Sequence, residues 1–216
     1  MSSKRSKVEV RPKEVRYYDL MISLIFLGSY SHFIKKVIEK MDLKSGENIL
    51  DLGSGTGKIE YFMAKKVGPE SRILGLDISK EMISIAKKRC QQYSQAQFQE
   101  QRIEEPLSFK EEFDNVFISF VLHGFEDNQK LKIIDNVFRA LKPGGIFYIL
   151  DYSHFDLEKL WFPIRWVFIH GECELAVEFL KLDLKRMLFN QGFTNFEEEF
   201  FFKKYLRLLK AIKPTS

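Results

Sequence analysis

Two aspartates and three glycines have the spacing of a nucleotide site. Asp51 ends a short apolar run, and Gly53, Gly55 and Gly57 follow it at alternate positions. Glycine lets the main chain turn sharply and leaves room for a ligand, and the helix that follows would direct free N–H groups at that ligand. Asp77 lies about twenty residues beyond this turn, where a carboxylate can accept both hydroxyls of a ribose. The pattern predicts a site for a nucleotide-type ligand.

The glycine pattern alone leaves the nucleotide open. Lys58 stands where a dinucleotide fingerprint of the G-x-G-x-x-G type requires a glycine, and the Lys-Ser/Thr ending of a P-loop is missing. A nicotinamide-dependent dehydrogenase remains an alternative, because it shares the strand, the turn and the acidic residue. Asp77 alone could also cap a helix, but together with the glycine turn it favours ribose binding.

His123 is the candidate catalytic residue. It follows an apolar run that predicts a buried strand, at the end of the strand where ligands bind in parallel sheets. An imidazole there could act as a general base, and a structural histidine is the alternative. Asp151, Tyr152 and His154, after the next expected strand, are weaker candidates. The histidines and cysteines have no metal-ligand spacing, so we predict no metal site.

The elements that would position these residues alternate between strand and helix after residue 45. This alternation predicts an open parallel sheet with helices on both faces. The first helix is expected to end at Gly68-Pro69, and Ser79 is expected to cap the second. Two strand-like runs near the C-terminus are separated only by Lys203-Lys204, which predicts an antiparallel hairpin at the sheet edge. The expected strands are residues 48–52, 72–76, 96–99, 116–122, 146–150, 195–202 and 205–212.

The composition predicts one domain with a full core. Of 216 residues, 45% are hydrophobic and 21 are Phe, which indicates an aromatic core or, in part, an apolar substrate cavity. The net charge of +4 is too small to indicate nucleic-acid binding. Cys90 and Cys173 lie far apart, so we expect free thiols and a cytoplasmic location. Basic residues precede the apolar residues 20–27, which we interpret as an amphipathic helix and not as a signal peptide.

Five motifs together resemble the class I S-adenosylmethionine-dependent methyltransferases. They occur in that family's order over residues 45–152. The resemblance implies an α/β fold with a Rossmann-like, seven-stranded, mostly parallel sheet and an antiparallel C-terminal hairpin strand. It also implies S-adenosyl-L-methionine as the cofactor. The motifs are Asp51-x-Gly53-x-Gly55-x-Gly57, Gly75-Leu76-Asp77-Ile78-Ser79-x-x-Met82, Phe113-Asp114, Ser119–Phe125 and Leu141-Lys142-Pro143-Gly144-Gly145.

The resemblance implies roles for the methionine and ribose sides of the site. Asp51 and the backbone of Gly53–Gly57, which includes Ser54, are expected to hold the amino and carboxylate ends of the methionine portion. Asp77 is expected to bind the ribose. Ser119 and Phe120 are expected to face the methionine portion and the transferable methyl group.

The adenine side of the site departs from the family's usual pattern at one position. Ile78 and Met82 are expected to line the adenine. Arg102 stands where the family often has an acid that meets the adenine amine, so the resemblance implies that this contact falls to the backbone of Ile103.

The methyl acceptor is not fixed by these motifs. Tyr18-Asp19-Leu20-Met21 resembles the opening of ubiquinone/menaquinone C-methyltransferases, which makes Tyr18 a further expected cofactor contact and a demethylated quinone precursor one acceptor. That subgroup has Arg-Asn where this chain has His123-Gly124. The broader expectation is a small-molecule acceptor, with a hydrophobic one favoured. A non-catalytic cofactor-binding subunit and RNA methylation are alternatives, although no basic RNA-binding module is evident.

We expect four parts within one methyltransferase domain. They are a helical cover (1–44), a cofactor-binding core (45–152), a helical insert and helix on the substrate side (153–192) and a hairpin (193–216). The aromatic residues of the insert could form a lid or substrate wall, and a packing helix is the alternative. Together with the basic N-terminus, the insert could contact an anionic membrane surface. The sequence does not predict the oligomeric state.

Overall fold

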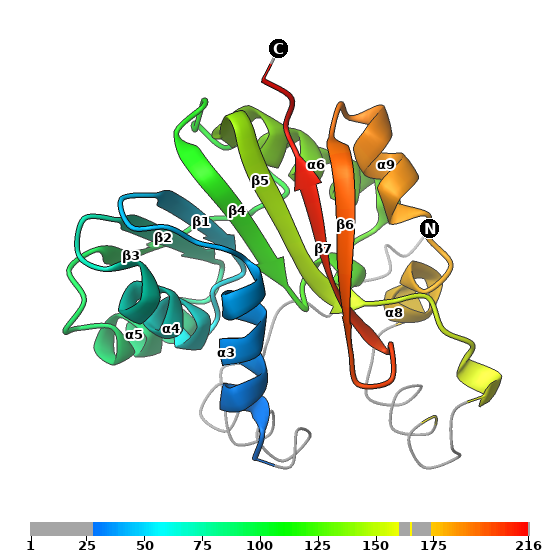
Figure 1. Cartoon of the computed structure of the whole chain (residues 1–216), viewed down its shortest axis with the longest axis horizontal. Coiled ribbons are helices and arrows are strands. Elements are labelled where there is room, and N and C mark those ends of the chain that lie inside the picture. The colour runs from blue at the N-terminus through cyan, green and yellow to red at the C-terminus, as the bar shows by residue number, and fades with distance from the viewer. Residues whose placement is uncertain (1–27, 160–164, 166–173, 216) are drawn as a thin grey trace.

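The computed structural model describes residues 28–159, 165 and 174–215, with one seven-stranded sheet at its centre (Figure 1). Its strands are β1 (Asn48–Leu52), β2 (Arg72–Asp77), β3 (Ala96–Glu100), β4 (Phe113–Ser119), β5 (Leu141–Tyr152), β6 (Thr194–Phe201) and β7 (Leu206–Ile212). The strand order is β3-β2-β1-β4-β5-β7-β6. β1 to β5 pair in parallel, and β7 lies antiparallel between β5 and the edge strand β6. The predicted fold class is confirmed.

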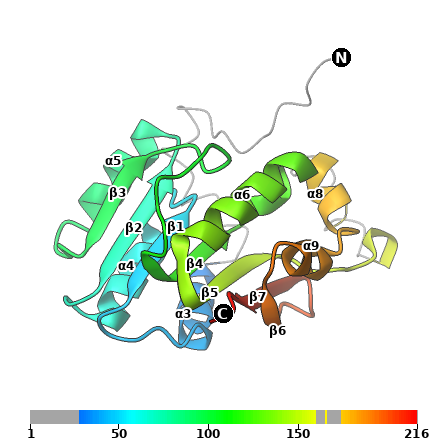
Figure 2. The same cartoon turned by 90° about the horizontal axis from the view of Figure 1, so that it is seen from above.

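Helices cover both faces of this sheet (Figure 2). They are α3 (Tyr30–Lys40), α4 (Lys58–Val67), α5 (Lys80–Arg89), α6 (Asp127–Ala140), α8 (Glu174–Phe179) and α9 (Leu184–Asn190), with the 3₁₀ turns η1 (Leu122–Gly124) and η2 (Leu157–Lys159). α3 and α4 pack in one apolar cluster with Ile49 of β1. α6, α8 and α9 pack in the other with Leu50 and Leu52. Because side chains alternate along a strand, Asp51 shares the face of Ile49 and lies beneath α4.

The ends of two strands differ from those expected. β4 begins at Phe113, because Asp114 does not interrupt it: this carboxylate pairs with Lys142 and accepts the Asn48 amide at the amino edge of the sheet. At the other edge, the expected strand over 116–122 is wrong beyond Ser119. The backbone turns at Phe120, which has a φ of +53°, and continues into η1. β5 likewise begins at Leu141, before the expected residue 146.

The other expected boundaries agree closely with the structure. α4 ends at Gly68, and the Ser79 side chain accepts the Met82 amide at the start of α5. α3 buries Phe33, Ile34, Val37 and Ile38 and forms part of the expected helical cover. Tyr18, the basic N-terminal stretch and most of the aromatic insert lie outside the described residues. No helix within residues 28–159 or 174–215 is long and apolar enough to cross a membrane.

Candidate cofactor and acceptor site

A glycine loop, residues 53–57, joins β1 to α4 and is fixed to the end of β2. The amides of Gly53 and Ser54 both donate to the Leu76 carbonyl, at 2.8 and 2.9 Å. Gly53 has a φ of +87°, and a Cβ added there would lie 2.6 Å from Cγ2 of Val121. Glycine is therefore required at this position by both conformation and space. The close approach also places the segment after β4 directly against the glycine loop.

Asp77 ties the glycine loop to the start of α5. Its Oδ2 accepts the Gly55 amide and its Oδ1 accepts the Ser79 amide, both at 2.8 Å. Burial raises the pKa of this carboxyl above its usual value, and these hydrogen bonds partly offset the rise. Each carboxylate oxygen has a second lone pair, so Asp77 can accept further hydrogen bonds. Its position fits the predicted ribose contact.

The sequence analysis expected the backbone of the glycine loop to hold the methionine portion of the ligand, but the loop amides make hydrogen bonds within the protein. The amides of Gly53, Ser54, Gly55 and Gly57 all donate within the protein, to Leu76, Asp77 and the Ser54 carbonyl. Those hydrogens therefore stay engaged unless the loop rearranges. The carbonyl oxygens of Ser54, Thr56 and Gly57 accept hydrogen bonds within the protein, so those of Gly53 and Gly55 are the better placed to accept from a cationic group. A contact between this loop and the carboxylate of the methionine portion stays a prediction.

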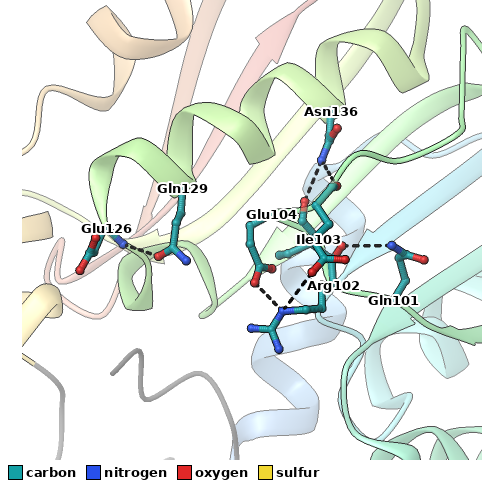
Figure 3. A network of polar contacts seen from close by, with 8 residues as sticks. Gln101, Arg102, Ile103, Glu104, Glu126, Gln129 and Asn136 are labelled. Carbon is teal, nitrogen blue, oxygen red and sulfur yellow. Dashed lines mark hydrogen bonds and ion pairs between the residues drawn. The ribbon is translucent and has the colours of Figure 1, made fainter. Parts of the chain in front are cut away.

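The residues expected around the adenine lie just after β2 and β3 and in the first turn of α5. Met82 and Ile103 are buried, and Ile78 is half-buried. Arg102 does not stand alone: its Nε lies 2.7 Å from Oε1 of Glu104 (Figure 3). Asn136 of α6 donates to the carbonyls of Ile103 and Glu105, at 2.9 and 2.6 Å, which fixes this segment beneath α6.

Glu104 is a residue that the sequence analysis missed. Its side chain is largely buried, and it brings a carboxylate to the segment where the family's acid was judged to be replaced. The only signal in the sequence was an acid two positions after Arg102.

A capping box begins helix α6: it is formed by Glu126 and Gln129 (Figure 3).

The carboxyl ends of β4 and β5 bring His123 and Asp151 together. His123 Nδ1 lies 2.8 Å from Asp151 Oδ1, and the His123 amide donates to Oδ2 at 3.2 Å. The Tyr152 amide also donates to Asp151, at 2.8 Å. Asp151 is 1% exposed and His123 is 8% exposed. Where Asp151 is the acceptor of this contact, Nδ1 is the donor of the neutral ring and Nε2 carries its lone pair.

Aromatic rings surround this His–Asp pair. The ring centroids of Tyr152 and Phe179 lie 5.1 and 6.3 Å from that of His123. Phe120, at the left-handed turn after β4, lies 6.3 Å from Tyr152. A non-glycine residue in this conformation is uncommon, and such strain clusters at functional sites. Ser119 precedes it, buried at the end of the strand. His154 is oriented elsewhere, with Nδ1 2.7 Å from the Leu180 carbonyl.

Two carboxyl groups are buried beneath the glycine loop. Asp51 is 1% exposed, and Glu60 of α4 is fully buried. Neither their four carboxyl oxygens nor Ser54 Oγ has a hydrogen-bond partner among the described residues. Burial is the main cause that raises the pKa of Asp51 to about 7. The pKa of Glu60 also lies well above its usual value, because of burial and the charge of Asp51.

Groups of three or more potential metal-binding side chains do not occur in the described part of the chain.

Comparisons with known proteins agree with this arrangement. Residues 43–183 match the family described as "Methyltransferase domain". A demethylmenaquinone methyltransferase of Lactobacillus johnsonii is 35% identical over 140 residues, which cover 63% of this chain and 57% of that protein. One of Oceanobacillus iheyensis is 29% identical over 200 residues, 83% of each chain. The chain spans little more than half the length of several of these curated relatives.

Solved structures show the same fold. A SAM-dependent methyltransferase from Aquifex aeolicus superposes with a TM-score of 0.69 at 19% identity, over 95% of this chain and 100% of that one. With its fold, its ordered motifs and the family match over most of its length, the chain belongs to the class I S-adenosylmethionine-dependent methyltransferases.

The site's chemistry fits the cofactor of this family. S-Adenosylmethionine carries an ammonium group and a sulfonium, both cationic, and the site has buried carboxyl oxygens that lack a donor. Asp77 retains acceptor capacity for ribose hydroxyls. The apolar side chains of Met82 and Ile103 suit the faces of an adenine ring.

Proposed function

We propose that this protein transfers the methyl group of S-adenosylmethionine to a small-molecule acceptor, with His123 as the general base. The observation that carries the proposal is the 2.8 Å contact between His123 and Asp151 at the carboxyl ends of β4 and β5. Val121, two residues before His123, contacts the glycine loop, so the base lies on the segment that adjoins the proposed donor site. Membership of the family supports the choice of methyl donor.

Different residues of the protein would bind the two ends of S-adenosylmethionine. Asp77 would accept the ribose hydroxyls, with Met82, Ile78 and the Ile103 segment around the adenine. Asp51 and the loop carbonyls would hold the amino group. Bound S-adenosylmethionine supplies a methyl group that its sulfonium makes electrophilic. The remaining task for the protein is to place a nucleophile in line with that methyl group and to exclude water.

His123 would remove the proton that the nucleophile loses. The Nε2 lone pair accepts a proton from an acceptor hydroxyl, and that oxygen, or a ring carbon conjugated with it, forms the new bond to the methyl carbon as the methyl carbon–sulfur bond breaks and S-adenosylhomocysteine is left. Where a ring carbon is methylated, it then loses its own hydrogen as a proton and the hydroxyl is restored. Asp151 then stabilises the imidazolium through Nδ1 and keeps the ring in one orientation. Asp151 is a positioning residue, because it acts through His123.

We propose an aromatic or quinone-like acceptor. The rings of Tyr152 and Phe179 contact His123, and that of Phe120 contacts Tyr152. Aromatic rings pack favourably against one another. The names of curated relatives, demethylmenaquinone methyltransferases among them, support a demethylated quinone precursor. A reducing, cytoplasmic location fits the buried, free Cys90. Contact with a membrane surface stays a prediction, since its segments lie outside the described residues.

Tritiated-methyl transfer tests this proposal. The purified protein is incubated with S-[methyl-³H]adenosylmethionine and a lipid and metabolite extract, and the products are separated. Label in the quinone fraction supports both the activity and the acceptor class. Label only in another small-molecule fraction supports methyl transfer and rejects the quinone. If the cofactor binds but no fraction is labelled, the non-catalytic alternative replaces the proposal.

A further inference from the structure

Asp51 and Glu60 reach the same point of the sheet from two different elements. Asp51 of β1 is paired in register with Gly75 of β2, so both lie on the same face. A Cβ added at Gly75 would lie 2.7 Å from Oε1 of Glu60 and 2.7 Å from Cβ of Ser54. The Glu60 carboxyl, which comes down from α4, therefore occupies the space that the missing side chain of Gly75 leaves beside Asp51.

This packing brings the two carboxyl groups together away from solvent. All four of their oxygens are buried and lack a partner in the described structure. Two neighbouring buried carboxylates repel each other and lose their hydration. A single proton held between them removes one charge and supplies the missing donor, so the pair satisfies itself with a net charge of −1.

We propose that Glu60 and Asp51 form a proton-sharing carboxyl pair, in which Glu60 donates and Asp51 accepts, and that this pair is the counter-charge for the ammonium group of the cofactor. The inference rests on the proposed function for the identity of the ligand. It assigns a role to Glu60 as a positioning residue, which holds Asp51 ionised and oriented beneath the glycine loop.

The electrostatic surroundings agree with this direction of the hydrogen bond. The hydrogen bond to Glu60 lowers the pKa of Asp51, whereas the charge of Asp51 raises that of Glu60, so Asp51 ionises first. The other charged group that acts on both is Asp77 of β2, which raises both pKa values.

The helix beside the pair adds no competing counter-charge. Cys90 follows α5, and burial and the charge of Glu60 raise the pKa of its thiol to about 12, so it stays neutral. Arg89 directs its guanidinium at the carbonyl and hydroxyl oxygens of Thr56, both at 2.6 Å. Phe98 and Phe117, on the flanking strands β3 and β4, are apolar.

Proton release on binding follows from this arrangement. Below about pH 7 the empty pair holds two protons, and an ammonium group placed beside it stabilises the ionised form of Asp51. The balance is one proton released from the pair to solvent for each cation bound. The affinity for the cofactor therefore decreases as the pH falls below this value.

Isothermal titration calorimetry in buffers of different ionisation enthalpy measures the number of protons released when a ligand binds. Two probes separate the groups of the ligand: S-adenosylhomocysteine has the ammonium group but no sulfonium, and 5′-methylthioadenosine has neither. We expect S-adenosylhomocysteine to release close to one proton at pH 5.5 and to bind about an order of magnitude more weakly there than at pH 7.5. Because both probes reach Asp77, any proton linked to that carboxyl is released by both, so we expect 5′-methylthioadenosine to release about one proton fewer than S-adenosylhomocysteine.

Variants of Glu60 separate the proton-sharing pair from simple packing. Glu60→Leu keeps the volume but removes the donor, and Glu60→Gln restores a neutral donor to Asp51. We expect Glu60→Gln to bind S-adenosylhomocysteine about tenfold more tightly than Glu60→Leu at pH 7.5. Glu70→Gln, an exposed exchange beyond the end of α4, is the matched control and should bind as the wild type does.

The outcomes distinguish this inference from the proposed function. Equal affinities of Glu60→Gln and Glu60→Leu, or binding of S-adenosylhomocysteine without proton release, would overturn the pair while leaving the methyltransferase proposal intact. Should Glu60→Leu fail to fold, the calorimetric comparison of the two probes on the wild-type protein still decides. Absence of binding by either probe would contradict the proposed function itself.

Discussion

The imidazole of His123 and the carboxylate of Asp151 lie 2.8 Å apart, although the two residues belong to segments that follow different strands. Asp151 receives three N–H groups, two from His123 and one from its own neighbour Tyr152. Such a buried acceptor fixes both the tautomer and the orientation of the ring. The geometry therefore separates the group that would take the proton from the group that holds it in place.

Asp151→Asn is expected to lower kcat by about 10²-fold or more, the scale on which general-base catalysis contributes. An amide can donate to Nδ1, which would move the proton of the neutral ring to Nε2, the atom proposed to accept it. The measurement is initial-rate kinetics with the acceptor that the labelling experiment identifies. We expect the KM for S-adenosylmethionine to change little, since Asp151 lies on the acceptor side.

His154→Gln is the matched control for this prediction, because His154 lies near the same strand end but bonds the Leu180 carbonyl. It should retain the wild-type kcat. A similar loss in both variants would indicate that the region is structural, and would remove the His123–Asp151 pair from the mechanism.

Asp77→Ala is expected to weaken the binding of S-adenosylhomocysteine by about 1–3 kcal/mol, the cost of losing a buried hydrogen-bond partner. The variant also loses the acceptor for the Gly55 and Ser79 amides, so its stability needs to be measured without ligand. Calorimetry of the folded variant supplies the affinity. An unchanged dissociation constant would remove Asp77 from the site.

The approach of Gly53 to Val121 predicts a specific steric coupling. Gly53→Ala should lower the free energy of unfolding by about 1–3 kcal/mol, because the new Cβ would lie 2.6 Å from Val121 and the backbone has a positive φ. Adding Val121→Ala should recover the steric part. Chemical denaturation of the two single variants and the double variant forms a double-mutant cycle.

Gly55→Ala supplies the control for that cycle. Gly55 also has a positive φ, of +53°, but a Cβ there would meet nothing within 4 Å. Its loss of stability should therefore be smaller and independent of Val121. Additive effects of Gly53→Ala and Val121→Ala would show that the loop is not held by this contact.

The parts of the site that could be predicted are local in sequence. The Asp51 turn, Asp77 and the Ser79 cap each follow from residues a few positions apart, and the structure places them together at the ends of β1 and β2. The antiparallel C-terminal hairpin was predicted, and β6 and β7 do pair in antiparallel fashion beside β5. Such motifs can be read from the sequence because each residue sets the conformation of the backbone next to it.

The parts that could not be predicted depend on contacts across the sheet. Asp151 and His123 were named separately, and only the pairing of β4 with β5 joins them. Glu60 lies on the buried face of α4, at helical spacing from Met63, Ala64 and Val67, but a single acid at that spacing does not indicate a buried carboxyl. The space that accommodates its side chain is left by Gly75 on another strand. The strand end at Ser119 was missed because Val121 and Leu122 continue the apolar run.

The raised pKa of Glu60 predicts how stability depends on pH in the ligand-free protein. A carboxyl with a higher pKa in the folded state than in the unfolded chain makes the folded state bind more protons above about pH 4.5. The free energy of unfolding contributed by this group therefore falls as the pH rises, by at most about 1.4 kcal/mol per pH unit. Glu60→Gln cannot titrate, so its stability relative to the wild type should increase from pH 4.5 towards pH 8. Denaturation of both proteins, with Glu70→Gln as the control, measures the difference at each pH. A difference that stays constant with pH would show that Glu60 titrates equally in the folded and unfolded chain, and that it holds no extra proton beneath the glycine loop.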